Sequence, residues 1–264
     1  STIVRTVLGD ESKDIRAIPM VFTRGCPYEC SFCYRLIRKW RHHSSEHVIS
    51  NLQYLRKTYN INAVQLNDEL VFVNKKWFIS LCEDIAKSDI DFKFLTGGGK
   101  PDLVTEEIII AMKKAGFKRI GYGLESGSPT ILDLMEKKAS VDHNYNAMEN
   151  TLKHGMLTSA NFVFGHPGEN KKTIKETTGF MYSLQKLQEK YGVLHDNFQY
   201  WFATAYHGSP LYEHALSKNL IDDEREYLLN LTAQNLYPIN LSDFSNVNDL
   251  KHFVSTQISI LEIK

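Results

Sequence analysis

The sequence predicts an α/β fold in which a partial (β/α)6 TIM-like barrel is followed by a C-terminal helical extension. Strand-like and helix-like segments alternate from about residue 18 to about residue 205, which is typical of parallel strands joined by crossover helices. The six units are fewer than the eight of a closed barrel, and later segments are helical. We therefore expect an N-terminal segment at 1–17, the barrel at 18–205 and the extension at 206–264.

The individual elements follow from short apolar runs and from helix caps. The expected strands are Pro19–Arg24, Ile61–Asn67, Asp91–Thr96, Lys118–Leu124, Leu157–Phe164 and Asn197–Ala203. The intervening helices are expected to begin after Ser44 or Ser45, Asn74, Thr105, Ser128 and Asn170, and one more at Asp142. In the extension, we expect helices at Ser209–Asn219, Asp222–Asn235 and Asn248–Ile263. The active site of such a barrel lies in the loops at the carboxyl ends of the strands.

The composition is that of an ordinary soluble protein. Basic and acidic residues both total 31, so no overall charge favours nucleic acid or an anionic membrane. No apolar run approaches the ~18 residues that a membrane-spanning helix needs, and the amino terminus has no signal-peptide core. We therefore expect a cytoplasmic protein.

A cysteine cluster follows the first expected strand. Cys26, Cys30 and Cys33 have the spacing C-x₃-C-x₂-C. Three soft thiolates on one tight loop can bind three irons of a [4Fe-4S] cubane and leave the fourth iron open for a ligand. The alternatives are a zinc site completed by His42 or His43, or a disulfide with one free thiol, although the usual zinc spacings are not found. Cys82 lies on the apolar face of an expected helix and is interpreted as a core residue.

With Phe32 as the aromatic residue before the last cysteine, this motif resembles the signature of the radical S-adenosylmethionine (SAM) superfamily. The Gly-Leu-Glu-Ser-Gly-Ser and Phe-Gly-His-Pro-Gly-Glu segments resemble the SAM-binding motifs at the fourth and fifth strands of that superfamily. The resemblance implies that the three cysteines are cluster ligands and that SAM chelates the open iron. It implies cofactor contacts from Phe32, Tyr34, Asp68, Glu69, Gly99, Glu125, Ser126 and Gly165. The Gly97–Gly99 run could equally leave room for a substrate.

Further segments resemble one branch of the superfamily, which contains cobalamin-dependent enzymes and methylthiotransferases. They are Arg38–Arg41, Tyr206–Tyr212 and Pro238–Leu241. Cobalamin is therefore possible, but its binding domain and the D-x-H-x-x-G pattern are not found in this chain. The implied partners are a small-molecule or peptide substrate and a reductase such as flavodoxin or ferredoxin.

Two groups of side chains remain to be assigned. The basic run from Arg35 to Arg41 is interpreted as a structural or solvated loop rather than a nucleic-acid site, because the total charges balance. Tyr200, Trp201 and Tyr206 could line a substrate pocket, with Trp201 the most suited to the core. The principal hypothesis is a radical SAM enzyme that abstracts hydrogen from a substrate or methylates it. The alternatives are a non-catalytic iron–sulfur protein for electron transfer or redox sensing, and a zinc-stabilised binding module.

Overall fold

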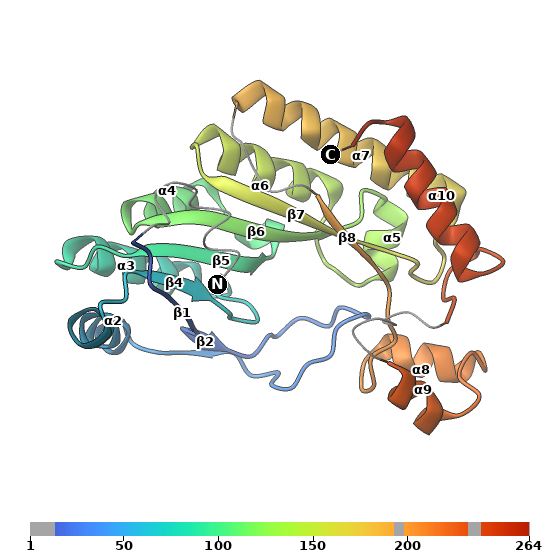
Figure 1. The fold of residues 1–264 in the computed structure, drawn as a ribbon, viewed down its shortest axis with the longest axis horizontal. Coiled ribbons are helices and arrows are strands. Elements are labelled where there is room, and N and C mark those ends of the chain that lie inside the picture. Colours follow the sequence, from blue (N-terminus) through green and yellow to red (C-terminus); the bar gives the residue numbers. More distant parts are fainter. Residues whose placement is uncertain (1–13, 193–197, 232–238, 264) are drawn as a thin grey trace.

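Six parallel strands form one curved sheet in the order β1-β4-β5-β6-β7-β8 (Figure 1). The computed structural model describes residues 14–192, 198–231 and 239–263. The strands are β1 (Ala17–Met20), β4 (Ala63–Leu66), β5 (Lys93–Gly99), β6 (Phe117–Glu125), β7 (Leu157–Phe164) and β8 (Gln199–Phe202). This half-barrel confirms the predicted fold class.

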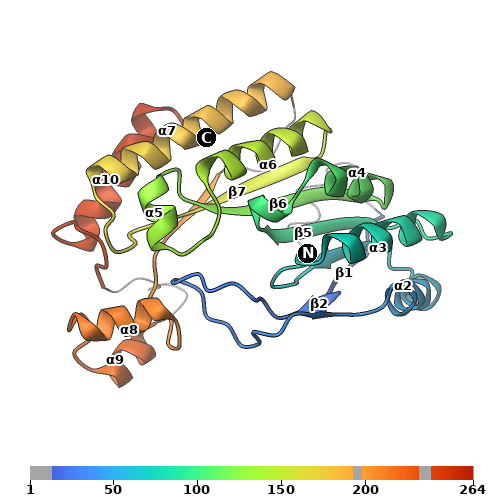
Figure 2. The same cartoon turned by 180° about the vertical axis from the view of Figure 1, so that it is seen from behind.

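Helices cover the convex face of the sheet (Figures 1 and 2). They are α2 (Ser45–Tyr59), α3 (Lys75–Lys87), α4 (Glu106–Lys114), α5 (Pro129–Leu134), α6 (Val141–Lys153) and α7 (Lys171–Tyr191), with a 3₁₀ turn, η2 (Pro101–Leu103), between β5 and α4. The caps at Ser44, Asn74 and Asn170 were correctly predicted, and each of these side chains accepts hydrogen bonds from backbone amides of the first helical turn. The main core lies between these helices and the sheet.

The first expected strand is wrong in its extent. The structure divides Pro19–Arg24 between β1 and a separate strand, β2 (Thr23–Arg24), which pairs antiparallel with β3 (Arg41–His42). The reason is Asp68, whose Oδ1 accepts hydrogen bonds from the amides of Phe22 and Thr23 at 3.0 and 2.5 Å. These amides are consequently not available for the main sheet, and the chain turns away toward the cysteines.

The third expected strand also differs. The run Gly97–Gly99 belongs to β5 instead of forming a loop after it. The packing at Gly99 is tight, because an added Cβ would lie 3.0 Å from both the carbonyl oxygen of Gly121 and the Tyr122 ring on the neighbouring strand. A shift in the pairing of β5 with β6 accompanies this run.

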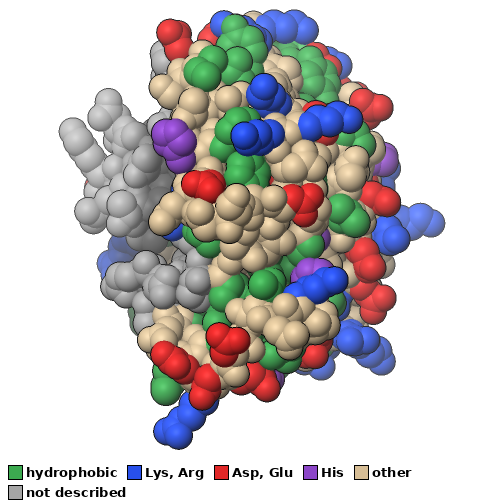
Figure 3. Space-filling model, turned by 90° about the vertical axis from the view of Figure 1, so that its right-hand side faces the viewer, with side chains coloured by type: hydrophobic (Ala, Val, Ile, Leu, Met, Phe, Trp, Pro, Cys, Tyr) green, Lys and Arg blue, Asp and Glu red, His purple; other side chains and the backbone are tan. Residues whose placement is uncertain are grey.

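The C-terminal part contains three described helices, α8 (Pro210–Ser217), α9 (Glu224–Asn230) and α10 (Val247–Ile260). Helix α10 packs on α7, whereas α8 and α9 form a small apolar cluster with the end of β8 (Figure 1). The predicted helical segments overlap these three helices. Residues 232–235 of the second predicted segment lie outside the described residues, as does Asn197, the first residue of the last expected strand. The exact domain limits stay predictions. Lysine, arginine, aspartate and glutamate side chains are intermixed over this end of the molecule (Figure 3).

Among the described helices, none is both long enough and apolar enough to cross a membrane.

Candidate functional site at the carboxyl edge of the sheet

The three clustered cysteines lie on the segment that leaves β2. All three are half-buried free thiols. The amide of Cys33 donates to the carbonyl of Cys30 at 3.1 Å, and the amide of Cys26 donates to the carbonyl of Ile37 at 3.0 Å. The segment is therefore a closed loop in which the three thiols come from one tight stretch of backbone.

The acidic pair after β4 holds the start of this loop. Oε2 of Glu69 accepts a hydrogen bond from the Gly25 amide at 2.6 Å, beside the Asp68 contacts to Phe22 and Thr23. Gly25 has a φ of +87°, and an added Cβ would lie 2.5 Å from the carbonyl oxygen of Lys39. In this structure, Asp68 and Glu69 thus position the cysteine loop. Their predicted contacts with SAM stay predictions.

A histidine after β7 holds the middle of the loop. Nε2 of His166 lies 2.9 Å from the Ser31 hydroxyl, between Cys30 and Phe32, and Nδ1 lies 3.2 Å from the carbonyl oxygen of Pro167. Burial lowers the pKa of His166 to about 4, so the ring is neutral at physiological pH. A neutral ring with its proton on Nδ1 donates to Pro167 and accepts from Ser31. This contact could not be inferred from adjacent residues, because Ser31 and His166 are 135 positions apart in the chain.

The surroundings of the thiols suit a metal cluster. Burial raises the pKa of the Cys30 and Cys33 thiols, and the nearby thiol of Cys26 contributes in the same direction. Thiols with raised pKa values stay protonated until a metal displaces the proton. Within the described residues, no three His, Cys, Asp or Glu side chains converge on a single metal ion. A cubane is larger than one ion, so three soft thiols on one loop fit it better than they fit zinc.

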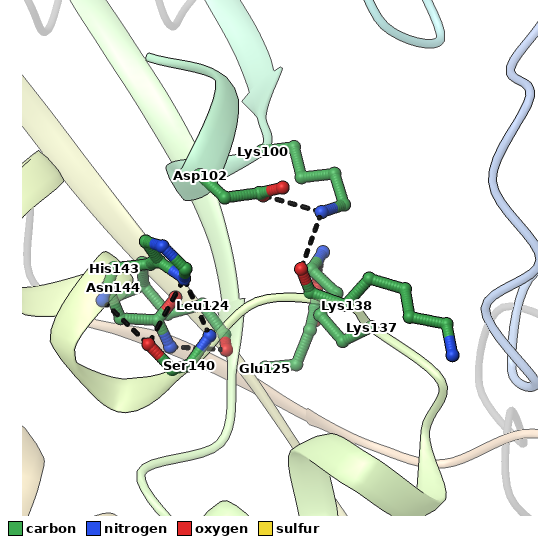
Figure 4. Close-up of polar contacts among 9 residues, drawn as sticks. All are labelled: Lys100, Asp102, Leu124, Glu125, Lys137, Lys138, Ser140, His143 and Asn144. Carbon is green, nitrogen blue, oxygen red and sulfur yellow. Dashed lines mark hydrogen bonds and ion pairs between the residues drawn. The ribbon is translucent and has the colours of Figure 1, made fainter. Parts of the chain in front are cut away.

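Two buried lysines lie beside the cysteine loop, and neither was predicted. Nζ of Lys137 is 2.8 Å from Oε1 of Glu125, and Nζ of Lys100 is 2.5 Å from Oδ1 of Asp102. Their exposed fractions are only 7% and 4%. Figure 4 shows Lys100 between Asp102 and the backbone carbonyl of Lys138. Buried cations at this place would offset the negative charge of thiolates that hold a cluster.

The pKa values of the two lysines are shifted in opposite directions. Burial disfavours the charge of Lys137, but Glu125 outweighs it, so the pKa of Lys137 is raised. For Lys100, burial dominates and the pKa is lowered despite Asp102. Both lysines also contact rings of the cysteine loop. Nζ of Lys100 lies 4.4 Å from the centre of the Tyr28 ring, and Nζ of Lys137 lies 5.9 Å from the centre of the Phe32 ring.

Glu125 is the predicted site residue that pairs with a buried lysine beside the cysteine loop. It has a φ of +63°, in the left-handed region that a non-glycine residue rarely adopts. By contrast, Ser126 is fully buried, and its hydroxyl lies 2.8 Å from that of Thr177 on α7. Its predicted SAM contact stays a prediction, as does that of Gly165, which has a φ of +88° at the end of β7.

The zinc alternative is not supported by the histidines. The ring of His42 packs on Trp77, with 4.5 Å between centres, and the ring of His43 stacks on His47 at 4.6 Å. These contacts direct both rings to α2 and α3. In the basic run, Arg35 donates to the carbonyl of Tyr28 and Arg38 forms a 3.7 Å ion pair with Glu29. These contacts within the cysteine loop favour the structural interpretation of that run.

The aromatic residues near β8 require one correction. Trp201 is 43% exposed and lies at a cavity, so the core interpretation of this residue is wrong. Tyr206 lines the same cavity, as predicted for a pocket residue. Tyr200 instead contacts Phe164 on the opposite face of the sheet, with ring centres 5.9 Å apart. Cys82 is fully buried in α3, as predicted.

The chain is similar to several known proteins. A model of the radical SAM superfamily matches residues 20–181. The chain is 31% identical over 242 residues to an uncharacterised methyltransferase of Pyrococcus horikoshii, covering 90% of this chain and 48% of that protein. It is 29% identical over 164 residues to the anaerobic magnesium-protoporphyrin IX monomethyl ester cyclase of Rubrivivax gelatinosus, covering 61% of this chain and 29% of that protein. The chain thus spans less than half the length of either relative.

Solved structures share the fold. The methyltransferase TsrM of Kitasatospora setae, described with cobalamin and a [4Fe-4S] cluster bound, superimposes with a TM-score of 0.67 at 14% identity, covering 76% of this chain and 39% of that chain. The cobalamin-dependent enzyme OxsB, with aqua-cobalamin and SAM bound, gives a TM-score of 0.66 at 19% identity, covering 96% of this chain and 42% of that chain. At such identities, the likeness establishes a common fold.

Proposed function

Because this chain belongs to the radical SAM superfamily, we propose that it cleaves SAM reductively at a [4Fe-4S] cluster held by Cys26, Cys30 and Cys33. When bound and reduced, the cluster supplies one electron that breaks the bond between the SAM sulfur and C5′, releasing methionine and a 5′-deoxyadenosyl radical. The radical abstracts hydrogen from a substrate or takes part in its methylation. The observation that carries the proposal is the closed loop of three free thiols beside buried lysines.

The buried ion pair gives this chain a means to bind the methionyl end of SAM. That end carries one ammonium and one carboxylate, and Glu125 and Lys137 carry the complementary charges 2.8 Å apart. We propose that Glu125 binds the ammonium or a ribose hydroxyl, while Lys137 binds the carboxylate. Exchanging one buried partner for another leaves no charge unpaired, so SAM can enter without a large desolvation penalty.

We propose that the remaining predicted residues position the cysteine loop or let SAM approach the backbone closely. Asp68 and Glu69 hold the start of the cysteine loop. Tyr34 stands at its other side, directly after the last cysteine. The backbone at Gly99 and Gly165 offers close approach at the ends of β5 and β7. Phe32 and Tyr34 lie on the cysteine loop itself and are proposed to contact SAM. We also propose a cytoplasmic location, because thiolate ligands require a reducing compartment.

The substrate and the electron donor belong to the same proposal. Relatives named as methyltransferases and cyclases support methylation or hydrogen abstraction on a small molecule, although a peptide also suits this chemistry. The electron donor is proposed to be a flavodoxin or ferredoxin. The D-x-H-x-x-G pattern is not in this sequence, so cobalamin would have to be held by residues outside this chain, and no step here depends on it.

The test is an anaerobic assay for SAM cleavage. The chain is reconstituted with iron and sulfide, reduced with dithionite and mixed with SAM. We expect 5′-deoxyadenosine in the mass spectrum and a cluster signal in electron paramagnetic resonance. Replacing any one of Cys26, Cys30 or Cys33 with Ala should abolish the nucleoside, and normal cleavage by such a variant would refute the ligand assignment.

The same assay separates the alternatives. A reducible cluster that leaves SAM intact, even with the full-length protein and candidate substrates, would favour an electron-transfer or redox-sensing protein. Binding of zinc without a visible chromophore would favour a zinc-stabilised module and would refute the enzyme proposal.

A further inference from the structure

Lys100 lies directly after β5, and none of the sequence motifs discussed above assigns a function to it. It is the residue that precedes η2, and its carbonyl accepts a hydrogen bond from the Leu103 amide at 3.0 Å. Its side chain is only 5% exposed, although lysine is among the residues that are most rarely buried. A lysine is buried at low cost only where its ammonium meets compensating charge.

Three groups surround this ammonium. Nζ of Lys100 lies 2.5 Å from Oδ1 of Asp102 and 3.4 Å from the carbonyl oxygen of Lys138, and Figure 4 shows both contacts. The third group is the ring of Tyr28, whose centre is 4.4 Å from Nζ. An ammonium over the face of an aromatic ring is attracted by the negative charge of that face. The ammonium is therefore held between its own strand end and the cysteine loop.

The contact with Tyr28 places this charge against the cysteines. Tyr28 stands between Cys26 and Cys30 in the sequence. Burial raises the pKa of the Cys30 thiol, whereas the charges of Lys137 and Lys100 act in the opposite direction. The ammonium of Lys100 is thus close enough to favour negative charge at the cysteine loop.

The opposite charge of Asp102 does not cancel this effect. The Asp102 side chain is 17% exposed, against 5% for Lys100, and solvent screens the more exposed group more strongly. It is also the ammonium that faces the Tyr28 ring. A negative charge on the cysteine loop therefore interacts more strongly with Lys100 than with Asp102.

The two buried lysines are suited to different tasks. Lys137 is paired with Glu125, and both are proposed to bind SAM, so the partner of Lys137 changes when SAM enters. The partners of Lys100 are Asp102 and a backbone carbonyl, and neither is among the groups proposed to bind SAM. Lys100 consequently keeps its place and its charge both before and after SAM binds.

We propose that Lys100 stabilises the one-electron reduced state of a [4Fe-4S] cluster on the cysteine loop, and that Asp102 limits this stabilisation. The inference rests on the proposed function, because it requires that the loop holds such a cluster. Reduction transfers one electron from an external reductant to the cluster and makes the site one unit more negative, with no bond broken and no proton moved. A fixed positive charge nearby lowers the free energy of the more negative state.

The test is a redox titration of the anaerobically reconstituted chain without SAM. Dithionite and mediator dyes set the potential, and electron paramagnetic resonance measures the reduced cluster. Lys100→Met should lower the ratio of reduced to oxidised cluster at a fixed potential by about threefold to tenfold, as expected for partly screened unit charges. A tenfold change corresponds to about 59 mV for a one-electron couple. Asp102→Asn should raise the same ratio by a similar factor, because it leaves the ammonium without its counter-charge.

The opposite signs separate charge from structure. Both single variants break the same ion pair, so a merely structural role would move the two ratios in the same direction. The double variant Lys100→Met with Asp102→Asn should return the ratio close to that of the unaltered chain. Lys87→Met, which removes an exposed lysine at the end of α3, is the matched control and should leave the ratio unchanged.

Iron and sulfide contents and circular dichroism check the cluster loading and the folding of each variant. If Lys100→Met does not fold, Asp102→Asn alone decides, since its ratio must rise. Shifts of the same sign in the two single variants, unchanged ratios, or a rise for Lys100→Met would overturn the proposal.

SAM cleavage is measured separately on the unaltered chain. Formation of 5′-deoxyadenosine together with unchanged ratios in the variants refutes the assignment of Lys100 alone. Opposite shifts in the variants without any nucleoside refute SAM cleavage alone. A chain that binds no cluster refutes both.

Discussion

Replacing Glu169 with Gln should remove much of the pH dependence of folding stability between about pH 6.5 and pH 8. Glu169 follows β7 and is fully buried. Its Oε2 accepts a hydrogen bond from the Gly165 amide, while its Oε1 is buried and has no hydrogen-bond partner. Burial raises its pKa from 4.5 to about 8, although the amides of Gly165 and His166 act in the opposite direction. At neutral pH, this side chain is therefore a protonated carboxylic acid.

The sign of the effect follows from proton binding. Between the unfolded pKa of 4.5 and the folded pKa of about 8, the folded protein holds one proton more than the unfolded chain. The stabilisation from Glu169 is complete below the unfolded pKa and is lost as the pH rises through the folded pKa. One pH unit in this window corresponds to about 1.4 kcal/mol. From pH 6.5 to pH 8, the expected loss of unfolding free energy is about 2 kcal/mol, because half of the Glu169 side chains are ionised in the folded protein at the upper limit.

The assay is urea unfolding of the metal-free chain, followed by far-ultraviolet circular dichroism across this pH range. His166 titrates at lower pH and is present in all variants, so its contribution cancels in the difference. Glu213→Gln, at an exposed position of α8, is the control and should run parallel to the unaltered protein. A Glu169→Gln profile that is also parallel to the unaltered protein would show that this carboxyl does not hold the extra proton.

Three further substitutions test other parts of the site. Cys82→Ala should leave the iron content unchanged and lower the unfolding free energy by about 1 kcal/mol, since the thiol lies in the core; loss of iron would bring Cys82 into the site. Lys137→Met should lower the unfolding free energy measured with urea by about 3–5 kcal/mol, because it leaves Glu125 buried and unpaired. The double variant with Glu125→Gln should regain part of this free energy. An effect below 1 kcal/mol would contradict burial of the pair. Ser31→Ala should lower the unfolding free energy by about 1 kcal/mol, because the contact with His166 is lost, and it should speed the release of iron to a chelator. An unchanged rate of iron release would argue against a role of this contact in positioning the cysteine loop.

Local signals were sufficient to predict most of the fold. Helix starts at Ser44, Asn74 and Asn170 are encoded by side chains that bond to the next turn, so they can be inferred from a few adjacent residues. The strand order follows from the alternation of strands and helices. The break between β1 and β2 could not be inferred in this way. It depends on Asp68, more than forty residues later in the chain, whose carboxylate takes amides that would otherwise extend the strand.

The candidate site was predictable only where motifs mark it. The cysteine motif and the Glu125 motif are each a short run of neighbouring residues, so each can be found in the sequence. Both follow parallel strands of one sheet, so both are expected at its carboxyl edge. The lysines gave no such signal. Lys100 and Lys137 are ordinary surface residue types in isolation, and only the packing of η2 and the segment after α5 beside the cysteine loop makes them buried cations. A charged residue among apolar neighbours is easily assigned to solvent when its partner is unknown.

The misassignment of Trp201 has a geometric origin. Three consecutive aromatic residues, Tyr200, Trp201 and Phe202, occupy β8, so hydrophobicity alone cannot tell which of them face the helices. A shift of one residue in pairing would exchange the two faces. The pairing of Val163 with Trp201 fixes the choice, and it places the tryptophan on the concave face beside Phe32.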